Sequence, residues 1–432
     1  MVYINNIKDL KSLTPKDILT IFMDTKIYRR YLQNAWTGKT GILKRFYNPI
    51  YFLDEISKGI TNAINSIIDE DYWLLILGEP GTGKSTLSIA IYKYIMKNLG
   101  YTDDQIKENI YLDVCYLPYD YLGRIALHNE QIQKKGKIFP HPIILDEAHN
   151  MFDMFAEGST NVTRKILQRI YEIREWRLAH IVNIQIPQQL AKRARHRFHS
   201  LIILWKEPIY FGRKKTFHIE QAYKSYIQNV LKKELPNDKM GYFLWGVFYE
   251  KDKTHRILRW IMKKDLSIEE LRPILLRFTP DIIFPMTFLL HEASDLREAY
   301  VKVKLYNSTI KTLYDAFGIR GSKKSIFLKT LIELNKNFDK INSDEMDEYG
   351  YYKLNNDVRI EIDDKEDYKV LKKIGNVKFT IKTDKKEDLK TYSERYYIEI
   401  SSIDPKIYNF LKNMHDILEK RPPIHKAVEY RL

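Results

Sequence analysis

The sequence is poor in the features that cross-link, anchor or export a protein. It has one cysteine, Cys115, among 432 residues, which excludes a disulfide framework and a cysteine-based zinc or iron–sulfur site. The longest apolar run, Ile282–Leu290, is interrupted by Pro285 and is far shorter than the ~20 residues that a membrane-spanning helix needs. Residues 1–10 contain Asn and Asp where a signal peptide would be apolar. We therefore expect a cytoplasmic protein without a membrane span.

The remaining composition is that of a folded, basic protein. Hydrophobic residues make up 44% of the chain and aromatic residues 13%, which excludes disorder as the dominant state. The length corresponds to two or three domains at roughly 100–200 residues each. There are 71 Lys and Arg against 56 Asp and Glu, for a net charge of +15. This charge favours a polyanionic partner such as DNA, although a solvated basic surface explains it equally well.

The apolar patterns divide the chain into four regions. Residues 1–70 are predicted to form a helical extension, 71–264 an α/β core, 265–341 a helical region, and 342–432 a small α+β region. Helix-length segments separate the core strands, which is typical of a parallel sheet with helices on both faces. The expected core strands are Trp73–Leu77, Ile110–Leu117, Ile143–Leu145, His180–Ile186 and Ser200–Trp205, followed by a hairpin of Tyr242–Tyr249 and Arg256–Ile261.

The region after residue 264 has two patterns of its own. Helical segments at Thr309–Phe317 and Ser322–Leu334 flank a turn at Gly318 and form a possible helix-turn-helix, with a lysine-rich second helix for a DNA groove. Any two helices joined by a glycine turn would give the same pattern. Further on, we expect an acidic loop, a small sheet and a last helix: the loop holds Asp344, Glu345, Asp347 and Glu348, the sheet segments are Tyr351–Ile362, Val370–Thr383 and Tyr396–Ser401, and the helix lies near Pro405–Leu418.

A glycine-rich segment follows the first predicted core strand and precedes a helical pattern. It matches the P-loop motif G-x-x-x-x-G-K-[ST], whose backbone N–H groups and helix N-terminus bind phosphates. Lys84 would reach the β- and γ-phosphates, and the Ser85 hydroxyl would ligate Mg²⁺. We therefore predict a site for ATP and Mg²⁺, formed by Gly78, Glu79, Pro80, Gly81, Thr82, Gly83, Lys84, Ser85 and Thr86.

Acidic and amide side chains end two later apolar runs. Asp146 and Glu147 follow Ile143–Leu145, which is the Walker-B pattern. Asp146 would hold Mg²⁺, and Glu147 would accept a proton from the attacking water. Gln185 lies in a run that we place next to the Walker-B strand, where it would face the γ-phosphate as a sensor; the alternative is a Gln that only caps a strand.

Together these motifs resemble the HerA/FtsK-type P-loop ATPases, and in particular the Zot-like proteins and the genome-packaging ATPases of archaeal viruses. The matching segments are GEPGTGKS (78–85), IILDEAHNMF (143–152), IYEIREWRLAHIVNIQIPQQL (170–190) and LIILW (201–205). The resemblance covers residues 70–262 and implies a ring-forming ATPase, from a virus or a mobile element, that moves DNA or assembles nucleoprotein. Residues 146–149 also spell the Asp-Glu-Ala-His box of a helicase family, but the second motor domain of that family is not visible.

Basic residues offer two further roles. In ring ATPases an arginine of one subunit meets the γ-phosphate bound by its neighbour, and Arg174 and Arg177 are our candidates because they precede the sensor strand. The segment 192–215 is rich in Lys and Arg and would contact DNA phosphates without reading sequence, although a solvated face is the simpler explanation. Its basic residues are Lys192, Arg193, Arg195, Arg197, Lys206, Arg213, Lys214 and Lys215.

The function predicted from the sequence is therefore a Mg²⁺-dependent, DNA-stimulated ATPase that moves or packages DNA as a homo-oligomeric ring. Two alternatives remain open. One is a Zot-like ATPase that acts on a protein machine, and the other is a regulatory NTPase with a DNA-binding tail.

Overall fold

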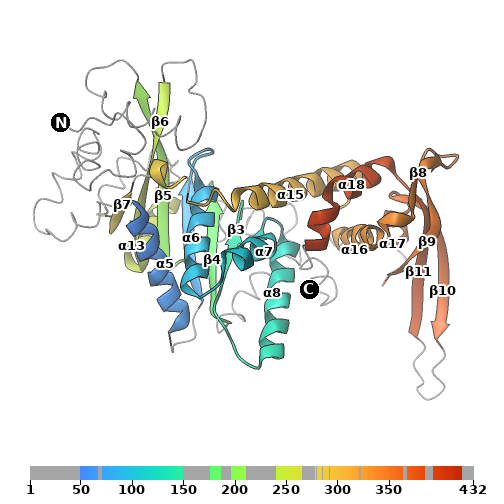
Figure 1. Cartoon of the computed structure of the whole chain (residues 1–432), viewed down its shortest axis with the longest axis horizontal. Coiled ribbons are helices and arrows are strands. Elements are labelled where there is room, and N and C mark those ends of the chain that lie inside the picture. The colour runs from blue at the N-terminus through green and yellow to red at the C-terminus, as the bar shows by residue number, and fades with distance from the viewer. Residues whose placement is uncertain are drawn as a thin grey trace, which may run out of the picture.

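The protein has two sheets that are joined by one long helix, α15 (Arg297–Phe317) (Figure 1). The computed structural model describes residues 49–66, 71–148, 176–185, 196–210, 240–264, 278, 280–284, 286–290, 292–320, 323–362, 367–384 and 393–420. The first 48 residues, Arg174, and residues 192–195 and 211–215 of the basic segment lie outside this description. Within it, no helix has the length and apolar character that a membrane crossing requires.

The core sheet has seven strands in the order β2-β3-β4-β1-β5-β6-β7. The five strands from β2 to β5 in this order are parallel. At one edge, β6 pairs antiparallel with β5, and β7 pairs antiparallel with β6. Residues 73–77 of β1 are almost fully buried, as expected for a central strand covered on both faces. The strands are β1 (Tyr72–Gly78), β2 (Val114–Cys115), β3 (His141–Leu145), β4 (Leu178–Ile184), β5 (Ser200–Tyr210), β6 (Met240–Tyr249) and β7 (Ile282–Phe284).

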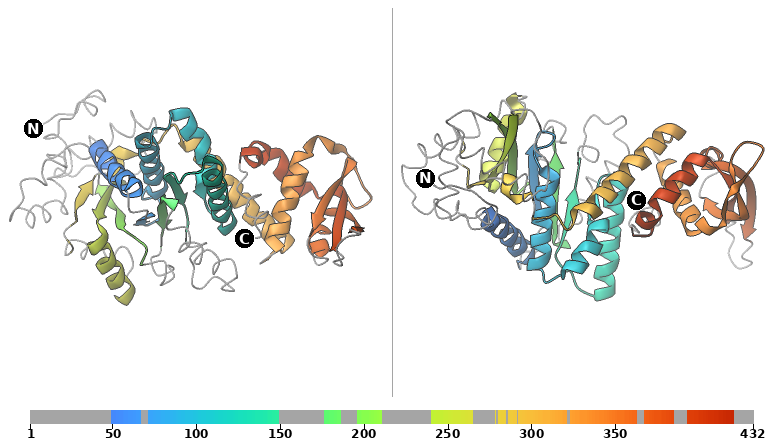
Figure 2. Two further views of the ribbon diagram at one scale, coloured as in Figure 1. Left: turned by 90° about the horizontal axis from the view of Figure 1, so that it is seen from below. Right: turned by 45° about the horizontal axis from the view of Figure 1, so that its top comes forward.

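Helices cover both faces of this sheet (Figure 2). Alternate residues of β1 point to opposite faces, so Leu74 and Ile76 join one hydrophobic core while Leu75 and Leu77 join the other. The first core also contains α5 (Pro49–Asn65), α6 (Lys84–Asn98) and α7 (Asp103–Asp113). The second contains α8 (Pro118–Lys135) and α13 (Lys251–Lys264). The predicted α/β fold class with helices on both faces is confirmed.

Two predicted strands are wrong. The first half of Ile110–Leu117 is the end of α7, which starts from a capping box of Thr102 and Gln105 and continues to Asp113, so that only the short β2 is strand. Arg256–Ile261 lies within α13, where Ile257, Leu258 and Ile261 face the core at helical spacing. A short apolar run fits both the two-residue period of a strand and the 3.6-residue period of a helix, which explains both errors. The predicted region limits stay predictions, although β7 extends the core sheet past residue 264.

The C-terminal sheet is antiparallel, with the order β10-β11-β9-β8. Each of the three predicted segments of this sheet contains a strand, although Val370–Thr383 is wrong in its first five residues, which are the end of α17 and a turn. The last predicted helix is present. The expected acidic loop is wrong in part, because its first residues belong to β8. The elements are η4 (Met286–Leu289), α16 (Lys323–Lys336), η5 (Phe338–Lys340), β8 (Ile341–Met346), β9 (Tyr352–Ile362), α17 (Asp367–Leu371), β10 (Gly375–Asp384), β11 (Ser393–Ile403) and α18 (Pro405–Lys420).

The second helix of the possible helix-turn-helix is not available for DNA. Eight of the ten residues from Ile326 to Asn335 are buried, because α16 packs against α17, α18 and β9. The Lys329 ammonium donates to the Glu361 carbonyl of β9 at 2.7 Å. A helix that enters a DNA groove needs a free side. The burial of α16 therefore contradicts this part of the prediction.

A glycine allows β6, β7 and α5 to meet. A Cβ atom at Gly246 would lie 2.0 Å from the Phe284 ring. That ring is 1% exposed and stacks on Phe52, with 3.6 Å between the centroids and 15° between the planes. The ring therefore has no room to move away from a larger side chain.

We predict that Gly246→Ala lowers the free energy of unfolding by about 1–3 kcal/mol, because the added methyl group overpacks the core. Urea denaturation would measure this loss. The matched control is Gly59→Ala in α5, where a Cβ meets nothing within 4 Å. That change should leave stability equal or raise it by about 0.5–1 kcal/mol, since alanine favours the helix. Equal denaturation midpoints for wild type and Gly246→Ala would contradict the packing argument.

Candidate functional site

Of the predicted site residues, those of the P-loop, Asp146, Glu147 and Gln185 meet at the carboxyl edge of the parallel strands. β4 pairs with β3 on one side and with β1 on the other. This register places the end of β1, at Gly78, beside Gln185, while Asp146 follows β3 directly. Ligand sites of open α/β sheets lie at this edge. The prediction that the Gln185 run is next to the Walker-B strand is confirmed, while the sensor role of Gln185 stays a prediction.

The glycine-rich loop leads into α6 through left-handed backbone conformations. Gly81 has φ 75° and Gly83 has φ 86°, which side chains with a Cβ rarely adopt. A Cβ at Gly83 would also lie 3.1 Å from Met286 Cε and 3.2 Å from Leu290 Cδ2. The loop conformation thus requires glycine for two reasons: its positive φ angles and its close packing against η4. It leaves the N-terminus of α6 directed at the site, as anion binding requires.

Lys84 lies folded over this loop. Its ammonium donates to the carbonyl oxygens of Gly78 at 2.5 Å and Glu79 at 2.8 Å, and the residue is only 8% exposed. Burial lowers the pKa of Lys84 to about 8; the nearby Asp146 carboxylate opposes this change, and neighbouring lysines add to it. Lys84 therefore loses its proton more readily than an exposed lysine does, and a bound polyphosphate would favour its charged form.

Asp146 is the most heavily hydrogen-bonded acid of the site. Ser85 Oγ donates to its Oδ2 at 3.2 Å, and Asn183 Nδ2 donates to its Oδ1 at 2.8 Å. The Tyr300 hydroxyl of α15 donates to the same carboxylate. Asn183 is held in turn by Ser88 of α6, whose Oγ donates to the amide oxygen at 2.6 Å. Asp146 is 2% exposed, so its charge depends on these donors.

Ser85 and Asp146 fit a magnesium ion. Mg²⁺ prefers oxygen ligands and is usually bound by one or two protein oxygens together with substrate phosphates and water. The hydroxyl and the carboxylate already touch at the mouth of the site. No described group of three or more His, Cys, Asp or Glu offers a metal site elsewhere. When bound here, the ion would neutralise phosphate charge.

Glu147 faces a cavity of about 280 Å³. Its backbone has φ 50°, a strained value for a residue other than glycine, and its side chain is 35% exposed. The Lys304 ammonium of α15 lies 3.2 Å from Glu147 Oε1. The side chains that surround the cavity include Lys84, Ser85, Asp146, Glu147, Gln185 and Lys304. An acid that can accept a proton thus lies beside a phosphate-sized space.

The described residues among the candidate arginines and the basic segment 192–215 are spread over both ends of the core strands. Arg177 precedes β4, and its carbonyl accepts from the N–H of His141 at the start of β3, so it lies at the edge away from the cavity. Arg197 precedes β5 and lies 3.7 Å from Asp71 at that same far edge. Lys206 lies at the cavity edge, beside Gly81. The described part of the segment 192–215 is therefore no continuous patch, and the arginine contributed by a neighbour stays a prediction.

A larger cavity, of about 740 Å³, lies at the far edge between α5, β1 and α13. It has no glycine-rich loop, and its lining includes Glu250, Asp252 and Asp281. These carboxylates would repel a polyphosphate. The smaller cavity at the P-loop is therefore the candidate nucleotide site.

The sequence motifs missed three side chains of the site. Asn183 lies two residues before Gln185 on the same strand face, so its polar side chain in an apolar run was a usable signal. Tyr300 and Lys304 belong to no motif and come from a region without recognised resemblance. Only the three-dimensional structure brings them to Asp146 and Glu147.

Comparison with known proteins gives similarity at the level of solved structures. No protein-family model and no curated protein matches this chain. The N-terminal domain of zonular occludens toxin from Neisseria meningitidis is 15% identical, with 42% of this chain and 85% of that one covered and a TM-score of 0.22. The genome packaging NTPase B204 from Sulfolobus turreted icosahedral virus 2, in complex with AMPPCP, is 13% identical, with 43% and 94% covered and a TM-score of 0.23.

The DNA-packaging ATPase B204 from Sulfolobus turreted icosahedral virus is 15% identical, with 43% and 96% covered and a TM-score of 0.22. These structures belong to the two groups that the sequence motifs resemble. At these scores the fold assignment rests on the strand order and the loop geometry of the chain itself.

We predict that affinity for a non-hydrolysable ATP analogue falls as the pH rises above about 8, by up to about tenfold per pH unit. Below the lowered pKa of Lys84 the ammonium is already charged, and above it the side chain must take up a proton in order to meet the phosphates. Titration calorimetry between about pH 7 and pH 9.5 would measure this. In Lys84→Arg, whose guanidinium stays charged, the affinity should be flat over the same range. A flat wild-type profile would contradict the prediction.

Proposed function

We propose that the protein hydrolyses ATP at the P-loop cavity. The observation that carries the proposal is the contact between Ser85 and Asp146 at a cavity that also holds Lys84 and Glu147. A phosphate cradle, a pair of metal ligands and a proton acceptor are the parts that nucleotide hydrolysis needs. These groups come from different elements at the same edge of the sheet, so it is the fold that brings them together.

Each side chain has a separate task. Lys84 would leave the loop carbonyls and bind the β- and γ-phosphates. Hydrolysis forms a bond from the water oxygen to the γ-phosphorus and breaks the bond from that phosphorus to the bridging oxygen, which leaves with its electron pair on ADP. The proton of the water passes to the Glu147 carboxylate. Asn183 keeps Asp146 oriented through the 2.8 Å hydrogen bond.

We predict that Glu147→Gln binds ATP with nearly wild-type affinity but lowers kcat at least about a hundredfold, because an amide cannot accept the proton. Lys84→Ala should lose both binding and hydrolysis. The control is Glu298→Gln, an exposed acid of α15 that pairs with Lys302 at 2.8 Å. Phosphate release and analogue binding would measure these effects. Lost ATP affinity in Glu147→Gln would place the base elsewhere.

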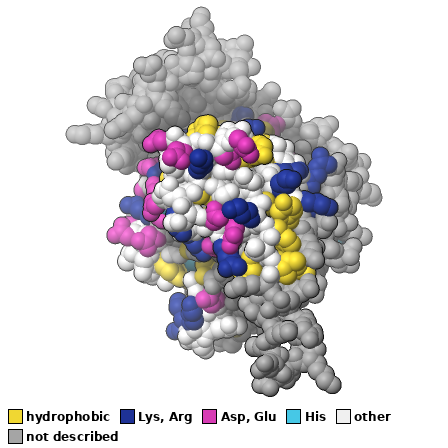
Figure 3. Space-filling view, turned by 90° about the vertical axis from the view of Figure 1, so that its right-hand side faces the viewer, with side chains coloured by type: hydrophobic (Ala, Val, Ile, Leu, Met, Phe, Trp, Pro, Cys, Tyr) yellow, Lys and Arg dark blue, Asp and Glu magenta, His cyan; other side chains and the backbone are white. Residues whose placement is uncertain are grey.

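The finer proposal is that hydrolysis moves or packages DNA. The net charge of +15 supports it. The described C-terminal region offers no basic face on the side seen in Figure 3, where acidic and basic side chains are interspersed. Within the C-terminal region, Lys353 lies 3.6 Å from Glu345, and Lys378 lies 3.8 Å from Asp357. DNA contact is therefore proposed for the basic segment 192–215 rather than for this face.

We predict that double-stranded DNA raises the ATPase rate severalfold at about 50 mM salt, and that this gain is lost by about 200 mM, because phosphate contacts release counterions. Glu147→Gln should show no gain, and heparin serves as the control for charge alone. Hydrolysis without any DNA effect would favour an assembly ATPase that acts on a protein machine. A monomer in every nucleotide state would favour a regulatory NTPase.

A further inference from the structure

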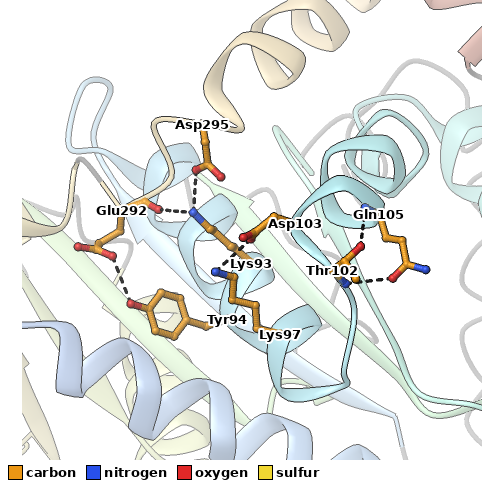
Figure 4. Close-up of polar contacts among 8 residues, drawn as sticks. All are labelled: Lys93, Tyr94, Lys97, Thr102, Asp103, Gln105, Glu292 and Asp295. Carbon is orange, nitrogen blue, oxygen red and sulfur yellow. Dashed lines mark hydrogen bonds and ion pairs between the residues drawn. The ribbon is translucent and has the colours of Figure 1, made fainter.

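The start of α15 is fastened to the helix that follows the P-loop. Figure 4 shows Lys93 and Tyr94 of α6 reaching the turn that precedes α15. Lys93 Nζ lies 2.8 Å from Asp295 Oδ1 and 3.3 Å from the Glu292 carbonyl oxygen, and the Tyr94 hydroxyl donates to Glu292 Oε2 at 3.2 Å. These contacts set where α15 begins relative to the nucleotide site.

The first turn of α15 then enters the site itself. The Tyr300 hydroxyl donates to Asp146, and the Tyr300 ring lies against Tyr116, with 6.2 Å between the centroids. Tyr300 is buried, and burial beside the Asp146 carboxylate raises the pKa of its hydroxyl, which keeps it protonated and able to donate. The hydrogen bond from Tyr300 therefore fixes the position of the start of α15 relative to Asp146 and Glu147.

Lys304 follows one helical turn later on the same face as Tyr300, since residues four apart are neighbours on a helix. Its ammonium lies 3.2 Å from Glu147 Oε1, and its side chain is 50% exposed. Among the described residues that surround the cavity, the cations are Lys84 and Lys304. Lys84 comes from the P-loop side and Lys304 from the opposite helix, so a phosphate between them would meet both.

We propose that Lys304 is a catalytic cation that binds the γ-phosphate of the ATP held by its own chain. This proposal rests on the proposed hydrolysis of ATP at the same cavity. It differs from the arginine that our sequence analysis expected a neighbouring subunit to contribute. The charge comes instead from the C-terminal part of the same chain.

The exchange of partners is physically easy. A half-exposed ion pair contributes little to stability, so Lys304 can exchange Glu147 for a phosphate of higher charge. The lysine stem is flexible enough to turn from one partner to the other. Once the ammonium binds the phosphate, it stabilises the charge that develops there, and Glu147 Oε1 loses its ion-pair partner and is open to the proton of the attacking water.

Three variants test the role of Lys304 in steady-state kinetics. Lys304→Ala should lower kcat at least about tenfold while the affinity for a non-hydrolysable ATP analogue changes less than about threefold, and Lys304→Arg should restore part of kcat. The matched control is Lys302→Ala on the same helix, since Lys302 is 49% exposed, pairs with Glu298 and does not surround the cavity. An unchanged kcat in Lys304→Ala would overturn the proposal. A raised kcat would also overturn it, because Lys304 would then only restrain Glu147.

A mixing experiment tests whether Lys304 acts within its own chain. Lys304→Ala keeps Glu147, and Glu147→Gln keeps Lys304. Mixed oligomers of the two should show no more activity than the sum of the separate proteins, because no chain holds both groups. Activity that appears on mixing would mean that Lys304 serves a neighbour, which overturns the proposal. If neither wild type nor Lys302→Ala hydrolyses ATP, the proposed function itself fails, whereas an active wild type with an equally active Lys304→Ala rejects Lys304 alone.

Discussion

The charge of Asp146 is the constraint on which the site depends. A carboxylate this deeply buried must receive hydrogen bonds, because an isolated ion costs many kcal/mol away from water. The structure provides donors from three elements: Ser85 of α6, Asn183 of β4 and Tyr300 of α15. Each donor comes from a different element, so α6, β4 and α15 are set relative to one another by one acid.

This arrangement makes the C-terminal part of the chain a component of the nucleotide site. The strands from β1 to β5 supply the phosphate cradle and the acids, as in any P-loop sheet. α15 then covers those acids, with Tyr300 on Asp146 and Lys304 on Glu147. The nucleotide would therefore meet a cavity that is already filled in part by side chains of its own chain, and binding would require those contacts to rearrange.

The sequence predicted what is encoded locally. The P-loop and the Asp146–Glu147 pair are short motifs whose chemistry fixes their letters, and the strands before them are buried enough to be plain apolar runs. The C-terminal end of α7 and the middle of α13 were mistaken for strands because a short apolar run has no clear period. Asn183 was within reach, since it is a polar residue in an apolar run and lies two residues before Gln185.

Tyr300 and Lys304 could not be predicted in the same way. Tyr300 is separated from Asp146 by 154 residues, and no motif connects the two. An ordinary amphipathic helix explains both residues equally well on sequence grounds. The burial of α16 was similarly invisible, because it depends on how β9, α17 and α18 enclose the helix. Contacts of this kind follow from tertiary packing rather than from local pattern.

The continuity of α15 has a geometric consequence. The helix runs for 21 residues without a break, from Arg297 after the turn that α6 contacts to Phe317, whose ring lies near that of Phe327 in α16. At about 1.5 Å per residue it is a rod roughly 30 Å long, and each residue adds a turn of about 100°. The number of residues in the helix therefore fixes the rotation of its C-terminal end relative to its N-terminal end. Inserting a single residue in its middle would rotate the C-terminal sheet about the helix axis and would also displace the contacts of α15 and α18 with α7, so the length of this helix and those contacts together set how the sheet faces the core.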